Sequence, residues 1–256
     1  MEERLRGRAP AWIFYCLPAL LFFTIFVAAP FFNTIRISFF EWDGLTKPQF
    51  IGLENYRQVW TDSALLMSFR NSLIFVIFFC IFPVATGIVI AALMSRRDLP
   101  GITAFRVIFF LPQIISGLVI GIAWRWMYSL DGTVNQILHW IGLGAVARGW
   151  LGDWTWAIIA VGLIGTWSLI GLTMILFIAG IQKIDFQLYD AAKIDGASAI
   201  REFFCVTIPG LRSEIAVAIT VTMIAALKTF DIVFATTNGG PGTSTRVPSI
   251  AIFQGG

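Results

Sequence analysis

The chain has 256 residues, of which 57% are hydrophobic and only 13% are charged. Soluble domains average about 45–50% apolar and about 25% charged residues, so this composition argues against a soluble globular protein. The formal net charge of +3 gives no indication of a nucleic-acid partner.

The apolar residues form blocks about as long as a bilayer crossing, which predicts an all-α polytopic membrane protein. The first block is longer than the apolar region of about 7–15 residues in a signal peptide, so we expect it to be retained as a span. The third contains the small-residue string S-G-L-V-I-G, which favours close helix contact. The five predicted spans are residues 11–32, 71–94, 107–128, 156–181 and 214–236.

The polar connections differ in character. Residues 33–70 are predicted to form a polar and aromatic loop, and residues 236–245 a turn. The turn contains Asn238, Gly239, Gly240 and Pro241, whose glycines are free to take positive φ. Its residues either shape the turn or contact a ligand. The ten tryptophans either form interfacial belts or stack on the flat apolar face of a ligand.

Only residues 247–253 remain for a sixth span, and they are too few to cross about 30 Å of hydrocarbon. We therefore expect a shortened or incomplete form of a protein that needs roughly twenty more residues for its last helix.

The segment 182–212 is charged and lies between two apolar spans. Residues 189–193 favour a helix, Gly196 favours a sharp turn, and Ser198 is a good cap for a second helix. Ile200, Phe203 and Phe204 would share one face of that helix, and Pro209 would end it. Periodicity alone leaves two interpretations open, a docking element and an ordinary interhelical loop.

The fifth span carries two charges, Lys228 and Asp231, at a spacing of i and i+3 that predicts a pair. Two charges at mid-bilayer cost roughly 5–7 kcal/mol, and about ten strong apolar residues return only roughly 3–6. The charges should therefore face other helices or a water-filled path; the alternative is that they snorkel to the interface.

No catalytic or metal-binding motif is present. The sequence lacks the phosphate-binding G-x-x-x-x-G-K-[ST], the nucleophile elbow G-x-S-x-G and the zinc motif H-E-x-x-H. Cys16, Cys80, Cys205 and the lone His139 are scattered without ligand spacing. We expect no catalytic residue, metal or bound cofactor, and any energy that is used would have to be supplied by another subunit.

The 182–212 segment resembles the "EAA" loop of binding-protein-dependent ABC importer permeases. The shared pattern is Asp190-Ala191-Ala192, three residues, Gly196, nine residues, Val206, one residue, Ile208-Pro209. Asp190 replaces the usual Glu, and Asp185-Phe186 stands where a proline is common. Phe50–Tyr56, Asn71–Phe75, and Phe230-Asp231 followed by T-N-G-G-P resemble the carbohydrate-type members.

The resemblance implies a type I ABC importer transmembrane domain that occupies residues 1–256, with five spans here and the start of a sixth. In the family this loop is the coupling helix that seats in a cytoplasmic ATPase. The implied ATPase-coupling residues are Asp190, Ala191, Ala192, Gly196, Ala197 and Pro209. Lys228, Phe230 and Asp231 would lie near the translocation path.

The implied partners are a second, paralogous permease subunit, two cytoplasmic ATPases that use ATP, an extracytoplasmic solute-binding protein and membrane lipid. The implied cargo is a sugar, an oligosaccharide or a polyol phosphate. An ion-coupled secondary transporter that uses Lys228 and Asp231 is the alternative, and a membrane-embedded enzyme is disfavoured because no acid–base or metal constellation occurs.

Positive charge predicts the orientation. Ten Lys and Arg residues would share the side of the N-terminus and the 182–212 segment, against six on the other side, which places the N-terminus in the cytoplasm of a bacterial inner membrane. The ten are Arg4, Arg6, Arg8, Arg96, Arg97, Arg106, Lys183, Lys193, Arg201 and Arg212. The six are Arg36, Lys47, Arg57, Arg70, Arg148 and Arg246.

Overall fold

The computed structural model describes residues 9–95 and 101–255, and nearly all of their regular structure is helical. The chain divides into two compact units, Met1–Ser63 and Ala64–Gly256. Of the predicted basic residues, Arg4, Arg6, Arg8, Arg96 and Arg97 lie outside the described part.

The first unit is one long helix followed by a small hairpin and a short helix. Its elements are α1 (Ala9–Phe23), the π-helical turn η1 (Thr24–Ala28), α2 (Ala29–Ile37), β1 (Phe40–Glu41), β2 (Gln49–Phe50) and α3 (Glu54–Thr61). The two strands pair antiparallel with Phe40 opposite Phe50. No residue in the apolar window of Tyr15–Ile37 is buried within the structure, as suits a helix whose sides are open to lipid or another subunit.

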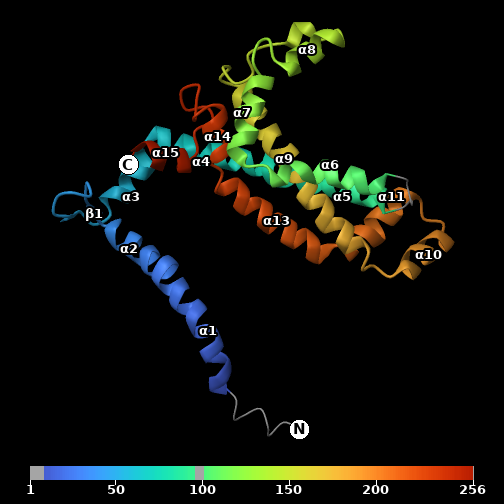
Figure 1. The fold of residues 1–256 in the computed structure, drawn as a ribbon, viewed down its shortest axis with the longest axis horizontal. Coiled ribbons are helices and arrows are strands. Elements are labelled where there is room, and N and C mark those ends of the chain that lie inside the picture. Colours follow the sequence, from blue (N-terminus) through green and yellow to red (C-terminus); the bar gives the residue numbers. More distant parts are fainter. Residues whose placement is uncertain (1–8, 96–100, 256) are drawn as a thin grey trace. The chain divides into compact units, whose positions relative to one another are not determined.

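The second unit contains the other helices (Figure 1). They are α4 (Ser63–Val76), which starts at the unit boundary, η2 (Ile77–Ile81), α5 (Phe82–Met94), α6 (Ile102–Ile114), α7 (Gly117–Met127), α8 (Thr133–Trp140), η3 (Gly144–Val146), α9 (Trp156–Ile181), α10 (Phe186–Ile194), α11 (Ala199–Glu202), η4 (Phe203–Thr207), α12 (Ile208–Gly210), α13 (Arg212–Leu227), α14 (Asp231–Thr236) and α15 (Pro248–Gly255).

Three described helices are long and apolar enough to cross a membrane: Tyr15–Ile37, Ser63–Met94 and Trp156–Ile181. The third has the bounds that the sequence predicts. The first ends five residues later than predicted, and the second begins eight residues earlier, inside the stretch predicted to be a loop. Two bent helix pairs raise the number of candidate spans to five.

The prediction of a continuous third span over 107–128 is wrong. The chain breaks at Ile115 and Ser116, and α6 and α7 meet at 101°. Pro112 removes one backbone donor from the last turn of α6. Beyond the break, α7 packs closely on α14, and a Cβ at Gly121 would lie only 2.5 Å from the Cβ of Ala235. The small-residue face of α7 therefore makes the close helix contact that its sequence predicts.

The prediction of a continuous fifth span over 214–236 is also wrong. Helix α13 ends at Leu227 and α14 begins at Asp231, with three non-helical residues between them. Lys228 and Asp231 therefore do not occupy i and i+3 of one helix, and in the described part of the chain no ion pair joins them. Packing against neighbouring helices, which a local pattern does not contain, decides this break.

Prolines in three of the helices follow π-helical turns. The turns η1, η2 and η4 each end two residues before a proline: Pro30, Pro83 and Pro209. A proline lacks the N–H and clashes with the carbonyl four residues earlier, and a wider turn moves that carbonyl away. The expectation that Pro209 ends its helix is therefore wrong, because the helix continues to Gly210 and breaks at Leu211.

The π-helical turn η2 leaves the carbonyl of Phe78 without a backbone donor, because the N–H of Phe82 donates to the carbonyl of Ile77 and Pro83 has no N–H. The hydroxyl of Thr166 on α9 donates to this carbonyl at 2.6 Å. The irregularity of one span is thus satisfied by a side chain of another, as expected inside a membrane bundle.

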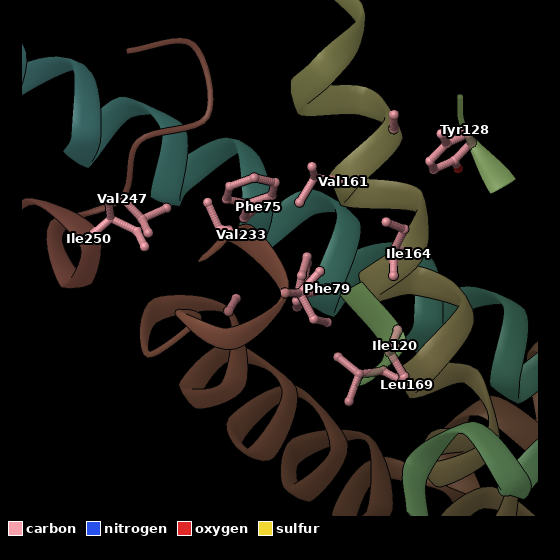
Figure 2. Packing of buried hydrophobic residues seen from close by; sticks show 13 residues of the cluster. Phe75, Phe79, Ile120, Tyr128, Val161, Ile164, Leu169, Val233, Val247 and Ile250 are labelled. Carbon is pink, nitrogen blue, oxygen red and sulfur yellow. The ribbon is translucent and has the colours of Figure 1, made fainter. Parts of the chain in front are cut away.

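The core of the second unit lies between α4, η2, α9 and α14 (Figure 2). Phe75 and Phe79 point from the second span towards Val161 and Ile164 of α9, and Val233 of α14 packs beside them. Glycines of α9 make this contact close, since a Cβ at Gly165 would overlap the ring of Phe79. Dense van der Waals packing of this kind holds membrane helices together in the absence of a hydrophobic drive between them.

Candidate functional site

The 182–212 segment forms two short helices joined by a sharp turn. Helix α10 begins at an Asp185 cap, whose carboxylate accepts from the N–H of Gln187 at 2.9 Å. It ends in a Schellman arrangement: the N–H of Gly196 donates to Lys193 and that of Ala197 to Ala192. Gly196 has φ +72°, and nothing lies within 4 Å of where its Cβ would be. The glycine therefore serves the left-handed turn and not close packing within this chain.

Ser198 caps α11, as its sequence position predicts. Its hydroxyl accepts from the N–H of Arg201 at 3.3 Å. The hydroxyls of Tyr189 and Thr207 lie 3.2 Å apart and connect α10 to η4. These contacts fix the angle between the two short helices.

The outer surface of this segment exposes large apolar side chains among charged ones. Asp190, Ala191 and Gly196 are exposed, whereas Ala192 and Ala197 are half-buried. Large apolar side chains with more than half of their surface exposed surround them: Phe186, Leu188, Ile194, Ile200 and Phe204. Phe203 differs from the prediction, because it packs inward on the cluster around Phe177 and Leu211. Figure 1 shows α10 at one extremity of the second unit, beyond the ends of α9 and α13.

The two ends of the segment are joined to each other. The ammonium of Lys183 and the carboxylate of Glu214 form an ion pair at 3.0 Å. A Cβ at Gly180 would meet the side chain of Leu211, which is fully buried. The end of α9 and the start of α13 are therefore held against each other at the base of the segment.

A cavity of about 350 Å³ lies where the two broken helices meet. Gly117, the first residue of α7, is so close to Asp231, the first residue of α14, that a Cβ there would lie 3.0 Å from the Cβ of Asp231. The lining residues are Phe79, Pro112, Gln113, Ile115, Gly117, Ile120, Ser168, Leu169, Ala225, Lys228, Thr229, Phe230, Asp231 and Ile232.

All three residues predicted to lie near a path, Lys228, Phe230 and Asp231, thus share this cavity. The two charged side chains are exposed in the single chain. Gln113, Ser168 and Thr229 add polar groups that sequence reasoning missed. Pro112 shortly before Ser116-Gly117 is the signal that could have revealed the break in the third span and so this part of the lining. No tryptophan whose side chain is described lines the cavity.

The turn 236–245 is held by contacts inside the chain. Asn238 and Gly239 have φ of +52° and +88°. Asn71, almost fully buried on α4, donates from Nδ2 to the carbonyls of Thr243 and Arg246 at 2.9 Å each. The hydroxyl of Thr245 donates to the carbonyl of Gly240 at 2.8 Å. These bonds favour a structural role for Asn238, Gly239, Gly240 and Pro241.

Residues 84–254, which include the 182–212 segment and the broken α13–α14 helix, match the family described as the binding-protein-dependent transport system inner membrane component. The chain belongs to this family. It is a multi-pass inner-membrane subunit of an ABC import system that depends on a binding protein. Family membership gives no support to the ion-coupled alternative.

Relatives and a solved structure agree with this assignment. The chain is 33% identical to the probable ABC transporter permease protein YurN of Bacillus subtilis, over 94% of this chain and 83% of that protein. It is 32% identical to the lactose transport system permease protein LacF of Rhizobium radiobacter, over 95% of this chain and 82% of that protein. The fold matches a bacterial alginate ABC transporter in complex with alginate pentasaccharide-bound periplasmic protein, with a TM-score of 0.79, 22% identity, and coverage of 97% of this chain and 84% of that chain.

Proposed function

We propose that this subunit forms half of a sugar path through the inner membrane and couples to a cytoplasmic ATPase through residues 182–212. The observation that carries the proposal is the exposed apolar face of this capped, two-helix element. The contacting residues are Asp190, Ala191, Ala192, Gly196, Ala197 and, in the returning helix, Pro209. The ATPase binds the ATP, and this chain requires no cofactor of its own.

The spans connect this element to the cavity. Helix α9 leads into the docking segment and contributes Ser168 and Leu169 to the cavity, and α13 leaves the segment and contributes Ala225. The ion pair of Lys183 with Glu214 holds the two helices together at the docking end. Movement of the ATPase would therefore shift both walls of the cavity at once.

The chemistry of the cavity suits a hydroxyl-rich cargo. Gln113 offers an exposed neutral donor and acceptor, the hydroxyls of Ser168 and Thr229 add polar groups, and the half-buried Phe230 adds an apolar ring. The transport of lactose by the relative LacF and the alginate fragment bound in the structural neighbour's complex support this class of cargo.

The proposed assembly contains a second, paralogous permease subunit, two ATPase subunits and an extracytoplasmic solute-binding protein. One chain contributes only one wall of the path, which is why its two charged cavity residues are open in the single subunit. The N-terminus and the docking segment lie in the cytoplasm, in agreement with the excess of basic residues on that side.

The test is co-expression of the full chain with its partner subunits, followed by co-purification with the ATPase and ATP-dependent uptake of labelled lactose and maltose. Ala191→Trp places a bulky ring on the docking face and is expected to abolish both. Ala145→Trp makes the same change at an exposed position of η3 and should preserve both. Retention of ATPase binding by Ala191→Trp would overturn the coupling assignment.

A further inference from the structure

The break between α13 and α14 exposes backbone groups that a continuous helix would pair. The N–H of Lys228 bonds Ile224 and that of Thr229 bonds Ala226, and the carbonyl of Phe230 accepts from Phe234. The carbonyl of Thr229 receives no backbone N–H from the described residues. An unpaired carbonyl next to an apolar core costs free energy, so a partner is required to stabilise this conformation.

That partner is a side chain of α15. The hydroxyl of Ser249 donates to the Thr229 carbonyl at 2.9 Å. Thr229 is buried and lies between the two charged residues that flank the break. Ser249 thus supplies the hydrogen bond that replaces the missing helical one.

A second contact from the same helix holds the other side of the break. The ring of Phe253 lies 5.4 Å from that of Phe230 and 5.5 Å from that of Phe234, both in edge-on geometry. The rings of Phe230 and Phe234 stack on each other at 5.2 Å. Ser249 and Phe253 are four residues apart, so they share one face of α15.

Helix α15 itself is firmly placed. Val247 and Ile250 are buried in the main core beside Val233 (Figure 2). The amide of Gln254 donates to the carbonyl of Asn238 at 3.4 Å, which connects the helix to the turn 236–245. The break is therefore held from outside by a helix anchored in the core.

We propose that Ser249 and Phe253 are positioning residues, which hold the α13–α14 break in the conformation that directs Lys228 and Asp231 to the cavity. Neither of the two lines the cavity. They act through Thr229 and Phe230, which do, by contacts to the Thr229 carbonyl and the Phe230 ring. The inference rests on the proposed function only in taking this cavity as part of the cargo path.

The test measures the geometry of the break directly. In the full chain, Cys16→Ser, Cys80→Ala and Cys205→Ser remove the native thiols, and Lys228→Cys introduces one at the break. The probe is the charged reagent methanethiosulfonate ethylsulfonate, and the measurement is its rate of reaction with membranes that contain the assembled transporter. Ser249→Ala and Phe253→Ala are each expected to change this rate by roughly two- to tenfold, the shift that corresponds to loss of one such interaction.

Two variants serve as controls. Ser249→Thr keeps the hydroxyl and should restore the rate of the Lys228→Cys parent. Ile252→Ala removes a side chain of the same helix that is 75% exposed, and should leave the rate unchanged. The proposal is overturned if Ser249→Ala and Phe253→Ala, present in the membrane at parental amounts, react at the parental rate. It is equally overturned if Ile252→Ala has as large an effect.

A measurement of sugar uptake distinguishes a failure of this inference from a failure of the proposed function. With Lys228 intact, Ser249→Ala should raise the KM for labelled sugar more than it lowers the maximal rate. If the reagent rates change and uptake does not, the positioning role stands and the cavity is excluded from the cargo path. If uptake changes and the reagent rates do not, the positioning role fails.

Discussion

The hydrogen bond between Thr166 and the Phe78 carbonyl provides a quantitative test of how the second span tolerates its proline. Thr166→Val keeps the shape of the side chain and removes the donor, which leaves this carbonyl unpaired. An unsatisfied buried group costs about 1–3 kcal/mol, whereas hydrogen bonds between membrane helices average about 0.6 kcal/mol because the unfolded chain also finds partners. We expect a loss of about 1 kcal/mol in the free energy of unfolding.

Thr222→Val is the matched control. Thr222 is fully buried, but its hydroxyl donates only to carbonyls of its own helix, those of Ala218 and Ile219, so its loss should cost less than about 0.5 kcal/mol. The assay is unfolding of the purified chain in mixed micelles by increasing SDS, followed by circular dichroism.

A second comparison uses Pro83→Ala, because this substitution restores a backbone N–H near the Phe78 carbonyl. In this background Thr166→Val should cost less than in the parent, with a coupling of about 0.5 kcal/mol or more in the double-mutant cycle. Equal costs for the Thr166 and Thr222 changes, or strict additivity with Pro83→Ala, would refute the reasoning.

Three further predictions concern other parts of the chain. Asn135 is 1% exposed, donates to the carbonyls of Ser129, Leu130 and Arg148, and accepts from Trp150. Asn135→Leu should therefore destabilise the loop by about 2–4 kcal/mol and make residues 129–152 sensitive to proteolysis, and cleavage at the parental rate would contradict this prediction. Gly171→Leu should prevent folding of the second unit, because even a Cβ at this position would overlap the Phe109 carbonyl. If the variant is monodisperse in detergent, the prediction is wrong and α6 can move away from α9. Hydrogen bonds from Thr46 and Leu45 lower the pKa of Asp43 to about 2, so the contribution of this carboxylate to the hairpin turn is present above its ordinary pKa and is lost as the pH falls through about 2. Hydrogen exchange of the Thr46 amide should stay slow from pH 7 to 4 in the parent and should be faster in Asp43→Asn at pH 7. Equal rates in the parent and the variant would exclude the carboxylate as the cause.

Local patterns were sufficient where the structure is local. Helix α9 begins and ends at the predicted residues, because an uninterrupted apolar stretch long enough for the bilayer lies between polar residues. The cap at Ser198 and the left-handed turn at Gly196 were predicted because capping and positive φ depend on neighbouring residues only. Lys228 and Asp231 were identified as residues that need a polar environment, because the cost of a charge in an apolar span is independent of the fold.

The cavity could not be predicted in the same way. Its walls come from residues far apart in the chain, such as Phe79, Gln113 and Ser168, and no periodicity connects them. The break at Ile115 was missed because the apolar stretch was taken as one helix through Pro112 and Gly117. The break at Thr229 was missed because the spacing of Lys228 and Asp231 was taken as one helix face, and the groups that contact this break, Ser249 and Phe253, come from another helix.

The sequence by itself therefore determined the membrane class, the capped helices of the 182–212 segment, and the presence of two charges that need a polar environment. Only the tertiary structure decided how the second span accommodates Pro83, where the third and fifth spans break, and that the broken ends of those two meet around one cavity. The physical reason is that a backbone carbonyl released from a helix is stabilised by whichever donor lies beside it. For the carbonyls of Phe78 and Thr229 those donors are Thr166 and Ser249, on helices that only folding brings near.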